Sequence, residues 1–238
     1  LSETTGKKGI CILTSRIEIT EFRKFYNFTV KKIDLPKLSD WYGAKLLKHL
    51  GVKGSNKDLK EVSKGVNGHS LLLYLIGNYL KHIYQGQLRY IERISISNEP
   101  TNTVRHFKKA HGSYEQWLEG KIELSILYTL AFFDRPVNDR LLENLRGRCF
   151  PKRDSDEPIS INIANLRKLG LIYNNSDKNG LLDMHPLVRE YFHDVLIDNF
   201  EKIYVDGNNW LYHHYKEMSV SKPENLIEVE ELILAMSF

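Results

Sequence analysis

The sequence predicts a mainly α-helical protein that contains one small β-hairpin. Apolar residues recur at helical spacing through most of positions 39–200, and several of these segments start at Ser, Asp or Asn and stop at Gly. One pair of short apolar runs, separated by an Asn- and Gly-containing turn at 174–180, has the pattern of a hairpin. Hydrophobic residues make up 42% of the chain and charged residues 27%, so its composition is that of an ordinary globular protein.

The net charge and the cysteines indicate which partners and which cellular compartment to expect. A formal net charge of +4 permits contact with an anion, but the chain lacks the concentrated basic stripe of a nucleic-acid binder. Cys11 and Cys149 lie far apart without metal-ligand spacing, which favours free thiols in a reducing cytoplasm. No apolar run approaches the ~18 residues of a membrane span, and the sequence has no signal peptide. We expect a cytoplasmic protein with no membrane partner and no metal site.

The first predicted element is a β-strand at Gly9–Arg16. Its continuous apolar run is typical of a strand buried on both faces of a parallel sheet. A lone parallel strand has no hydrogen-bonding partners, so we expect the other strands to precede Leu1 in a longer protein. A second extended segment is expected at Phe28–Leu35, where it ends at Pro36.

A helical bundle is expected from residue 37 to about 118. Ser39 or Asp40 is suited to cap a helix that ends at Gly51, and a second helix is expected to start near Ser55 or Asn56. The segment Asn67–Ser70 should break that helix. A long apolar helix then follows, from Leu71 to about Tyr84.

The next segment has the order of elements found in winged-helix domains. Three helices are expected at Ile122–Phe133, from Pro136 through Leu145 and at Ile159–Leu169, with a polar loop at 147–158 before the third. A hairpin of Leu171–Tyr173 and Leu181–Met184 follows, and Pro186 is suited to open one more helix, which runs to about Phe200. Helices at Trp210–Met218 and Leu226–Phe238 are expected to start a helical repeat array.

Three short segments could contact a phosphate-bearing ligand. Arg16 would follow the carboxyl end of a parallel strand, where α/β sheets bind ligands, although by itself it could also be a surface arginine on a loop. Gly68 would let the backbone approach a ligand just before a helix with free amides, although glycine in such places is more often a turn. His185 would lie beside a helix N-terminus, which favours anions, although a histidine there is more often a structural cap.

Together, the segments Leu13–Arg16, Gly68–Leu73 and Met184–Pro186 resemble the STAND class of signal-transduction NTPases, in its NB-ARC-like and bacterial branches. The first is similar to the family's sensor 1 strand, and the second to its Gly-Leu-Pro-Leu segment beside the adenine. The third resembles its Met-His-Asp motif, whose histidine contacts the β-phosphate of ADP in the closed, inactive state. The C-terminal segment is similar to the first tetratricopeptide-like helices of the bacterial members.

This resemblance implies a division into domains and a set of nucleotide contacts. The implied domains are 1–36 as the end of an α/β nucleotide-binding domain, 37–118 as a helical domain, 119–200 as a winged helix and 201–238 as the start of the repeats. The implied contacts to ADP or ATP are Arg16, Gly68, His69, Ser70, Leu71, His185 and Pro186. The implied partners are an upstream P-loop domain, a downstream repeat sensor with a protein ligand, and other copies of the chain in an active homo-oligomer.

The sequence departs from the family pattern at three points. Ser70 replaces a proline, and Pro186 replaces the aspartate of the third motif. No Gly-x-x-x-x-Gly-Lys-Ser/Thr motif occurs in the chain, so phosphate cradling and Mg²⁺ binding are expected upstream. We therefore expect no catalytic residue in this segment, whereas the parent protein would be an ATPase in bacterial antiphage defence or regulation.

Two other functions stay open on the sequence. A winged helix can read DNA with its third helix, which here carries Asn162, Asn165, Arg167 and Lys168. That basic face is thin, so contact with nucleic acid is not the favoured interpretation. A nucleotide-independent adaptor scaffold is the other alternative, and Ser70 is the residue that most supports it.

Overall fold

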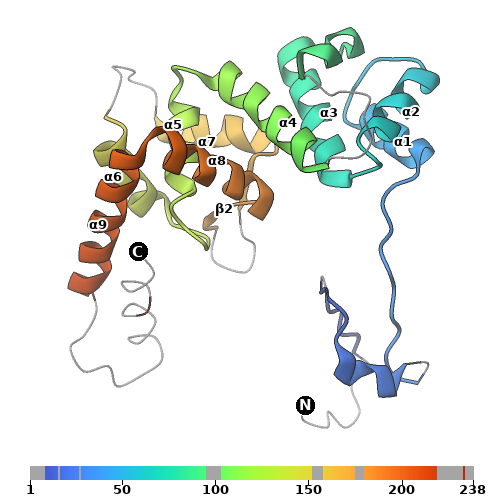
Figure 1. The fold of residues 1–238 in the computed structure, drawn as a ribbon, viewed down its shortest axis with the longest axis horizontal. Coiled ribbons are helices and arrows are strands. Elements are labelled where there is room, and N and C mark those ends of the chain that lie inside the picture. Colours follow the sequence, from blue (N-terminus) through green and yellow to red (C-terminus); the bar gives the residue numbers. More distant parts are fainter. Residues whose placement is uncertain are drawn as a thin grey trace. The chain divides into compact units, whose positions relative to one another are not determined.

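The computed structural model is mainly helical, which confirms the predicted fold class at that level (Figure 1). It describes residues 9–15, 17–26, 28–94, 103–151, 158–174, 180–218 and 233. Within these residues it contains nine α-helices, two short 3-10 helices and one two-stranded antiparallel sheet. The chain forms two compact units, Leu1–Pro36 and Lys37–Phe238.

The first unit differs from the sequence prediction. Residues 9–15 are extended but form no β-strand, and Ile10 and Ile12 are 93% and 85% exposed. The physical reason is that none of the described residues supplies a hydrogen-bonded neighbour to this segment. The segment expected to extend from Phe28 likewise forms no strand. The one helix or strand among the described residues of this unit is the 3-10 helix η1 (Thr20–Phe25), which was not predicted.

The second unit begins with three helices close to the predicted positions, of which the first two start at the predicted capping residues. They are α1 (Asp40–His49), α2 (Asn56–Gly65) and α3 (Ser70–Tyr84). The Ser39 hydroxyl accepts a hydrogen bond from the Tyr42 amide, and the Ser55 hydroxyl accepts one from the Asp58 amide. The apolar faces of the three helices bury Leu47, Leu59 and Leu72 completely, so these helices share one core.

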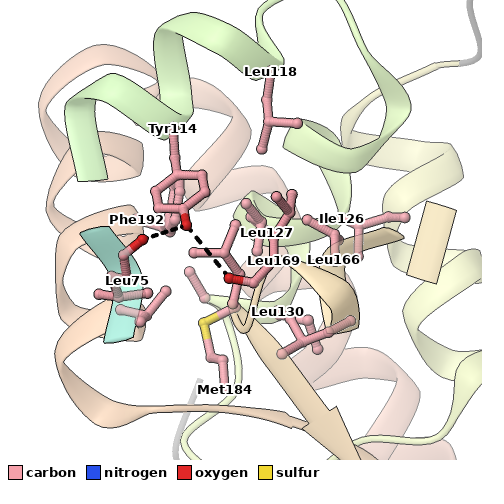
Figure 2. Close-up of a cluster of buried hydrophobic side chains, with 14 of the residues drawn as sticks. Leu75, Tyr114, Leu118, Ile126, Leu127, Leu130, Leu166, Leu169, Met184 and Phe192 are labelled. Carbon is pink, nitrogen blue, oxygen red and sulfur yellow. Dashed lines mark hydrogen bonds between the residues drawn. The ribbon is translucent and has the colours of Figure 1, made fainter. Parts of the chain in front are cut away.

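Helix α4 (Thr103–Leu118) connects the first three helices to the rest of the unit. It follows the 3-10 helix η2 (Leu88–Ile94) and contacts α3 as well as α5 and α8. The buried Tyr114 hydroxyl donates to the Leu75 carbonyl at 2.8 Å and lies 3.4 Å from the Leu169 carbonyl (Figure 2). One side chain of α4 therefore bridges α3 and the C-terminal end of α7.

The middle of the unit consists of three helices and a hairpin, in the predicted order. These are α5 (Ile122–Leu130), α6 (Asp139–Cys149), α7 (Ile159–Lys168), β1 (Ile172–Asn174) and β2 (Leu182–Met184). The strands pair antiparallel, with Ile172 opposite Met184. Val137, between α5 and α6, exchanges two backbone hydrogen bonds with Leu182, at 2.9 and 2.8 Å.

Several predicted boundaries in this region were wrong. α6 starts at Asp139 rather than Pro136, because Val137 pairs with β2 and the Asn138 side chain caps the helix by accepting from the Leu141 amide at 2.8 Å. α5 ends at Leu130 rather than Phe133, and α6 extends to Cys149, into the start of the expected loop. Positions 152–157 of that loop lie outside the described residues.

Two long helices complete the described part of the unit. α8 (Pro186–Asn199) starts at the predicted proline, whereas α9 (Glu201–Met218) begins well before the predicted Trp210. α9 packs against α6 and α8, where Gly207 approaches the Phe132 ring so closely that an added Cβ would lie 2.5 Å from it. The helix expected at Leu226–Phe238 lies outside the described residues except for Ile233, so the repeat array stays a prediction.

The boundaries at 118 and 200 are also still predictions, because all residues from Lys37 onward belong to one compact unit. The structure has no helix, among the parts of the chain that it describes, with the length and apolar character needed to cross a bilayer.

Candidate functional site

His185 occupies the sharp junction between β2 and α8. Its backbone is extended, and its carbonyl accepts hydrogen bonds from the Val188 and Arg189 amides at 2.9 and 3.0 Å. Its side chain caps the helix, because the Leu187 amide donates to His185 Nδ1 at 3.2 Å. A neutral imidazole that accepts at Nδ1 carries its proton on Nε2. The cap therefore fixes the tautomer and makes Nε2 the atom that could donate to an anion.

His111 on α4 lies near His185 and is completely buried. Its ring stacks on Tyr191 at 5.1 Å and on Phe107 at 5.9 Å between ring centres. Neither ring nitrogen has a hydrogen-bonding partner of normal geometry among the described residues. Burial lowers the pKa of His111 to about 4. A weak hydrogen bond with the Phe107 backbone opposes this shift, and His185 adds to it when its own ring is protonated.

His69, at the start of α3, packs against the same Phe107 ring as His111. Its imidazole packs edge-on against Phe107, with ring centres 4.8 Å apart. Its Nδ1 atom is buried without a partner in the described structure, and burial followed by the nearby charge of Lys37 lowers its pKa. His69 is the N-cap of α3 but makes no side-chain capping bond. The first-turn amides of α3, including those of the exposed Ser70 and half-buried Leu71, therefore lack a side-chain cap.

Gly68 is explained by a close approach within the chain itself. It has a φ of +62°, and a Cβ at this position would lie 1.9 Å from the Leu38 carbonyl oxygen. The Leu38 amide donates to the Gly68 carbonyl at 3.0 Å. The glycine is needed because residues 37–38 cross directly over the start of α3, which brings Lys37 beside His69.

The structure thus brings some predicted site residues together and leaves others apart. His69 and His185 are linked through Phe107, His111 and their stacking neighbours, which we call the histidine–aromatic set: His69, Phe107, His111, His185 and Tyr191. Pro186 is exposed at the first turn of α8. Arg16 lies outside the described residues, so its predicted role has no structural description.

Sequence reasoning missed the residues of α4 that connect the set. Phe107 and His111 are four residues apart, so on a helix they share one face. That spacing could have marked them as a pair, but only the fold shows that His69 and Tyr191 lie on either side of them.

Glu115, one turn after His111 on α4, accepts hydrogen bonds from two tyrosine hydroxyls. One of its carboxylate oxygens accepts from the Tyr128 hydroxyl at 2.6 Å and the other from the Tyr191 hydroxyl at 2.5 Å. Burial and these bonds to Glu115 raise the pKa of both tyrosines, so both remain donors. Because Tyr191 also stacks on His111, Glu115 fixes one wall of the histidine–aromatic set.

Neither a metal centre nor a known family identifies this site. The described residues contain no group of three or more His, Cys, Asp or Glu side chains placed to hold a metal ion. The sequence matches no protein-family model, and no curated protein matches it either. Function therefore has to be inferred from the residues themselves.

Proposed function

We propose that this chain is the regulatory helical and winged-helix segment of an ATP/ADP-controlled STAND-type switch, which holds the ADP-bound inactive state. The observation that carries the proposal is the histidine–aromatic set. It links the start of α3 with the start of α8, the two places where the family resemblance assigns nucleotide contacts.

The chemistry of the set suits a phosphorylated ligand. His185 keeps Nε2 as its donor at the positive end of a 14-residue helix. His69 contributes a half-buried ring with an unpartnered nitrogen beside the uncapped first turn of α3, and Lys37 adds a positive charge nearby. A nucleotide would supply the charge that these groups complement; the protein's part is to bind it and to hold the two helix ends together.

The order of elements supports the winged-helix part of the proposal. α5, the Val137 pairing, α6, α7, β1 and β2 follow one another as the helices and strands of a winged helix do, with Val137 as a third, one-residue strand. α9 follows α8 almost without a break, which suits the first helix of a repeat array.

The remaining components come from the resemblance alone. In this proposal an upstream P-loop domain cradles ATP or ADP and binds Mg²⁺, and the segment described here contributes no hydrolytic group. A protein ligand at the downstream repeats would weaken the closed state, and the open form would assemble as a homo-oligomer in the cytoplasm. The biological setting would be bacterial antiphage defence or regulation.

DNA reading by α7 is disfavoured by the packing of its polar residues. The Asn165 amide donates to Glu123 Oε1 at 3.1 Å, and Asn162, which is 3% exposed, reaches both oxygens of the same carboxylate when its amide is oriented to donate. Among the described residues of α7, the exposed polar groups left for a base or phosphate contact are Ser160 in the first turn and Arg167 and Lys168 at the end.

Two substitutions of His185 can separate a ligand contact from a helix cap. His185→Ala removes both the cap and the Nε2 donor. His185→Asn keeps a good N-cap oxygen but removes Nε2, so it is the matched control for stability. Both variants, in the protein expressed from its complete open reading frame, are expected to lose bound ADP and the stability that it confers. His185→Ala should melt at a lower temperature than His185→Asn, because it also loses the helix cap.

The readout is nucleotide released by denaturation and quantified by chromatography, with thermal unfolding recorded on the same samples. His213→Ala, at an exposed position on α9, serves as the neutral control. If His185→Asn retained ADP as the unaltered protein does, His185 would be only a structural cap. If the unaltered protein bound no nucleotide, the adaptor-scaffold interpretation would replace the proposal.

A further inference from the structure

A cavity of about 480 Å³ is lined in part by residues on both sides of the β2–α8 junction, Met184 and Pro186. It is formed by the residues that follow α5, the hairpin, and the facing sides of α8 and α9. No residue of the histidine–aromatic set lines it, although Pro186, one of the nucleotide contacts implied by the resemblance, does. Its volume lies in the range of pockets that take small organic groups.

The cavity already holds one guanidinium, that of the chain's own Arg189. Arg189 donates to Asp183 Oδ1 at 2.5 Å and to the carbonyl of Phe133, just past the end of α5. Both partners of the ion pair are largely buried, with side chains 15% and 13% exposed. Asp183 is thereby neutralised, and the Phe133 carbonyl accepts a hydrogen bond from the same guanidinium.

One wall of the cavity is aromatic. Tyr204 stacks on Phe132, with ring centres 5.8 Å apart and an interplanar angle of 24°. His193 packs edge-on against Tyr204, and its Nε2 lies 3.2 Å from the Tyr204 hydroxyl, which fixes the orientation of that ring. Faces of aromatic rings attract cations through their quadrupoles.

One of the carboxylates that line the cavity has no cationic partner among the described residues. Asp134 pairs with Arg135 at 2.7 Å, and this contact holds the pKa of Asp134 below its usual range. Glu190 forms no ion pair or hydrogen bond with any residue that the structure describes, and the same holds for the side chain of Asn208. The cavity therefore has an uncompensated carboxylate, an unused amide oxygen and an aromatic ring among its lining residues.

We propose that this cavity binds an ammonium or guanidinium group. Glu190 would pair with the cation, Asn208 would accept one of its N–H groups, and Tyr204 would contact it through its ring. Such a group can come from the basic side chain of a partner polypeptide or from a free polyamine, since both present the same chemistry.

Titration of the 238-residue chain with two probes tests the site. Agmatine represents the free amine, and acetyl-Gly-Arg-Gly-amide represents a polypeptide side chain; binding is followed by calorimetry and by two-dimensional NMR. Saturable binding of at least one probe is expected, with a Kd below about 1 mM. Glu190→Gln should weaken it about fivefold, the ratio expected for one partly exposed ion pair.

Glu143→Gln is the matched control, since Glu143 is an exposed acid on α6 outside the cavity. An unchanged Kd in this variant supports a specific site. The proposal is overturned if neither probe saturates by about 10 mM, or if both substitutions weaken binding equally, because attraction to the surface charge would then explain it. Tighter binding of the peptide would identify a polypeptide partner, and tighter binding of agmatine a free polyamine; either order supports the cavity as a cation site.

Discussion

His111 should make the stability of the protein depend on pH in a predictable way. Its ordinary pKa of 6.5 falls to about 4 in the folded protein, because its ring is buried without a hydrogen-bonding partner of normal geometry. The folded state therefore favours the neutral ring, and the unfolded state binds a proton more readily. The stability from this group is fully present above pH 6.5 and is lost as the pH falls toward 4.

The size of the effect follows from the two pKa values. A shift of this size corresponds to about 3 kcal/mol once the folded-state pKa is reached, and to about 2 kcal/mol between pH 7 and pH 5. Because the His111 side chain is 0% exposed, solvent screening does not reduce this free-energy difference. His111→Leu, which keeps a similar volume and cannot titrate, should lose this part of the pH dependence.

Urea unfolding at pH 7 and pH 5 measures the difference. The unaltered chain should lose about 2 kcal/mol more than His111→Leu over this interval. His213→Leu, at an exposed position on α9, should behave as the unaltered chain does. If His111→Leu showed the same loss as the unaltered chain, the ring would not be held neutral by burial, and the reasoning would be refuted.

Two further substitutions test how α3 is attached to its neighbours. Tyr114→Phe removes the hydroxyl that donates to the Leu75 carbonyl, so it should cost about 1–2 kcal/mol in urea unfolding; a change within error would mean that α3 and α7 are not joined through this group. Gly68→Ala places a methyl group against the Leu38 carbonyl at a positive φ, and it should cost at least about 2 kcal/mol by the same measurement. An alanine variant as stable as the unaltered chain would show that residues 37–38 do not cross the start of α3.

Local signals predicted the elements that depend on local chemistry. The polar pairs at 39–40 and 55–56 and the proline at position 186 predicted helix starts to within a residue, because a capping oxygen or a proline satisfies or removes an amide within the same turn. The hairpin was also predicted, because its two runs and its turn are contiguous. These features need no knowledge of distant residues.

Elements set by distant contacts were missed. Pro136 looked like a helix start, but Val137 pairs with Leu182 and so delays α6. The expected strand at residues 9–15 would need neighbours that the described residues do not supply. The early start of α9 reflects packing against α6 and α8, which no local pattern encodes.

The candidate site was likewise predictable from the sequence only in part. His185 could be selected from its junction, and its cap is visible in the sequence as a histidine before a proline. The stacking of Phe107 and His111 between His69 and Tyr191 depends on how α4 lies against α3 and α8. The sequence therefore indicated two ends of the set, and the fold supplied the residues between them.

The most direct test of the proposed switch is the nucleotide content of the protein purified from its complete open reading frame. The proposal predicts close to one ADP per chain, released only on denaturation and exchanged for ATP slowly. Protein that carries no nucleotide, and that binds no added ADP in equilibrium dialysis, would contradict the proposed role of His69 and His185.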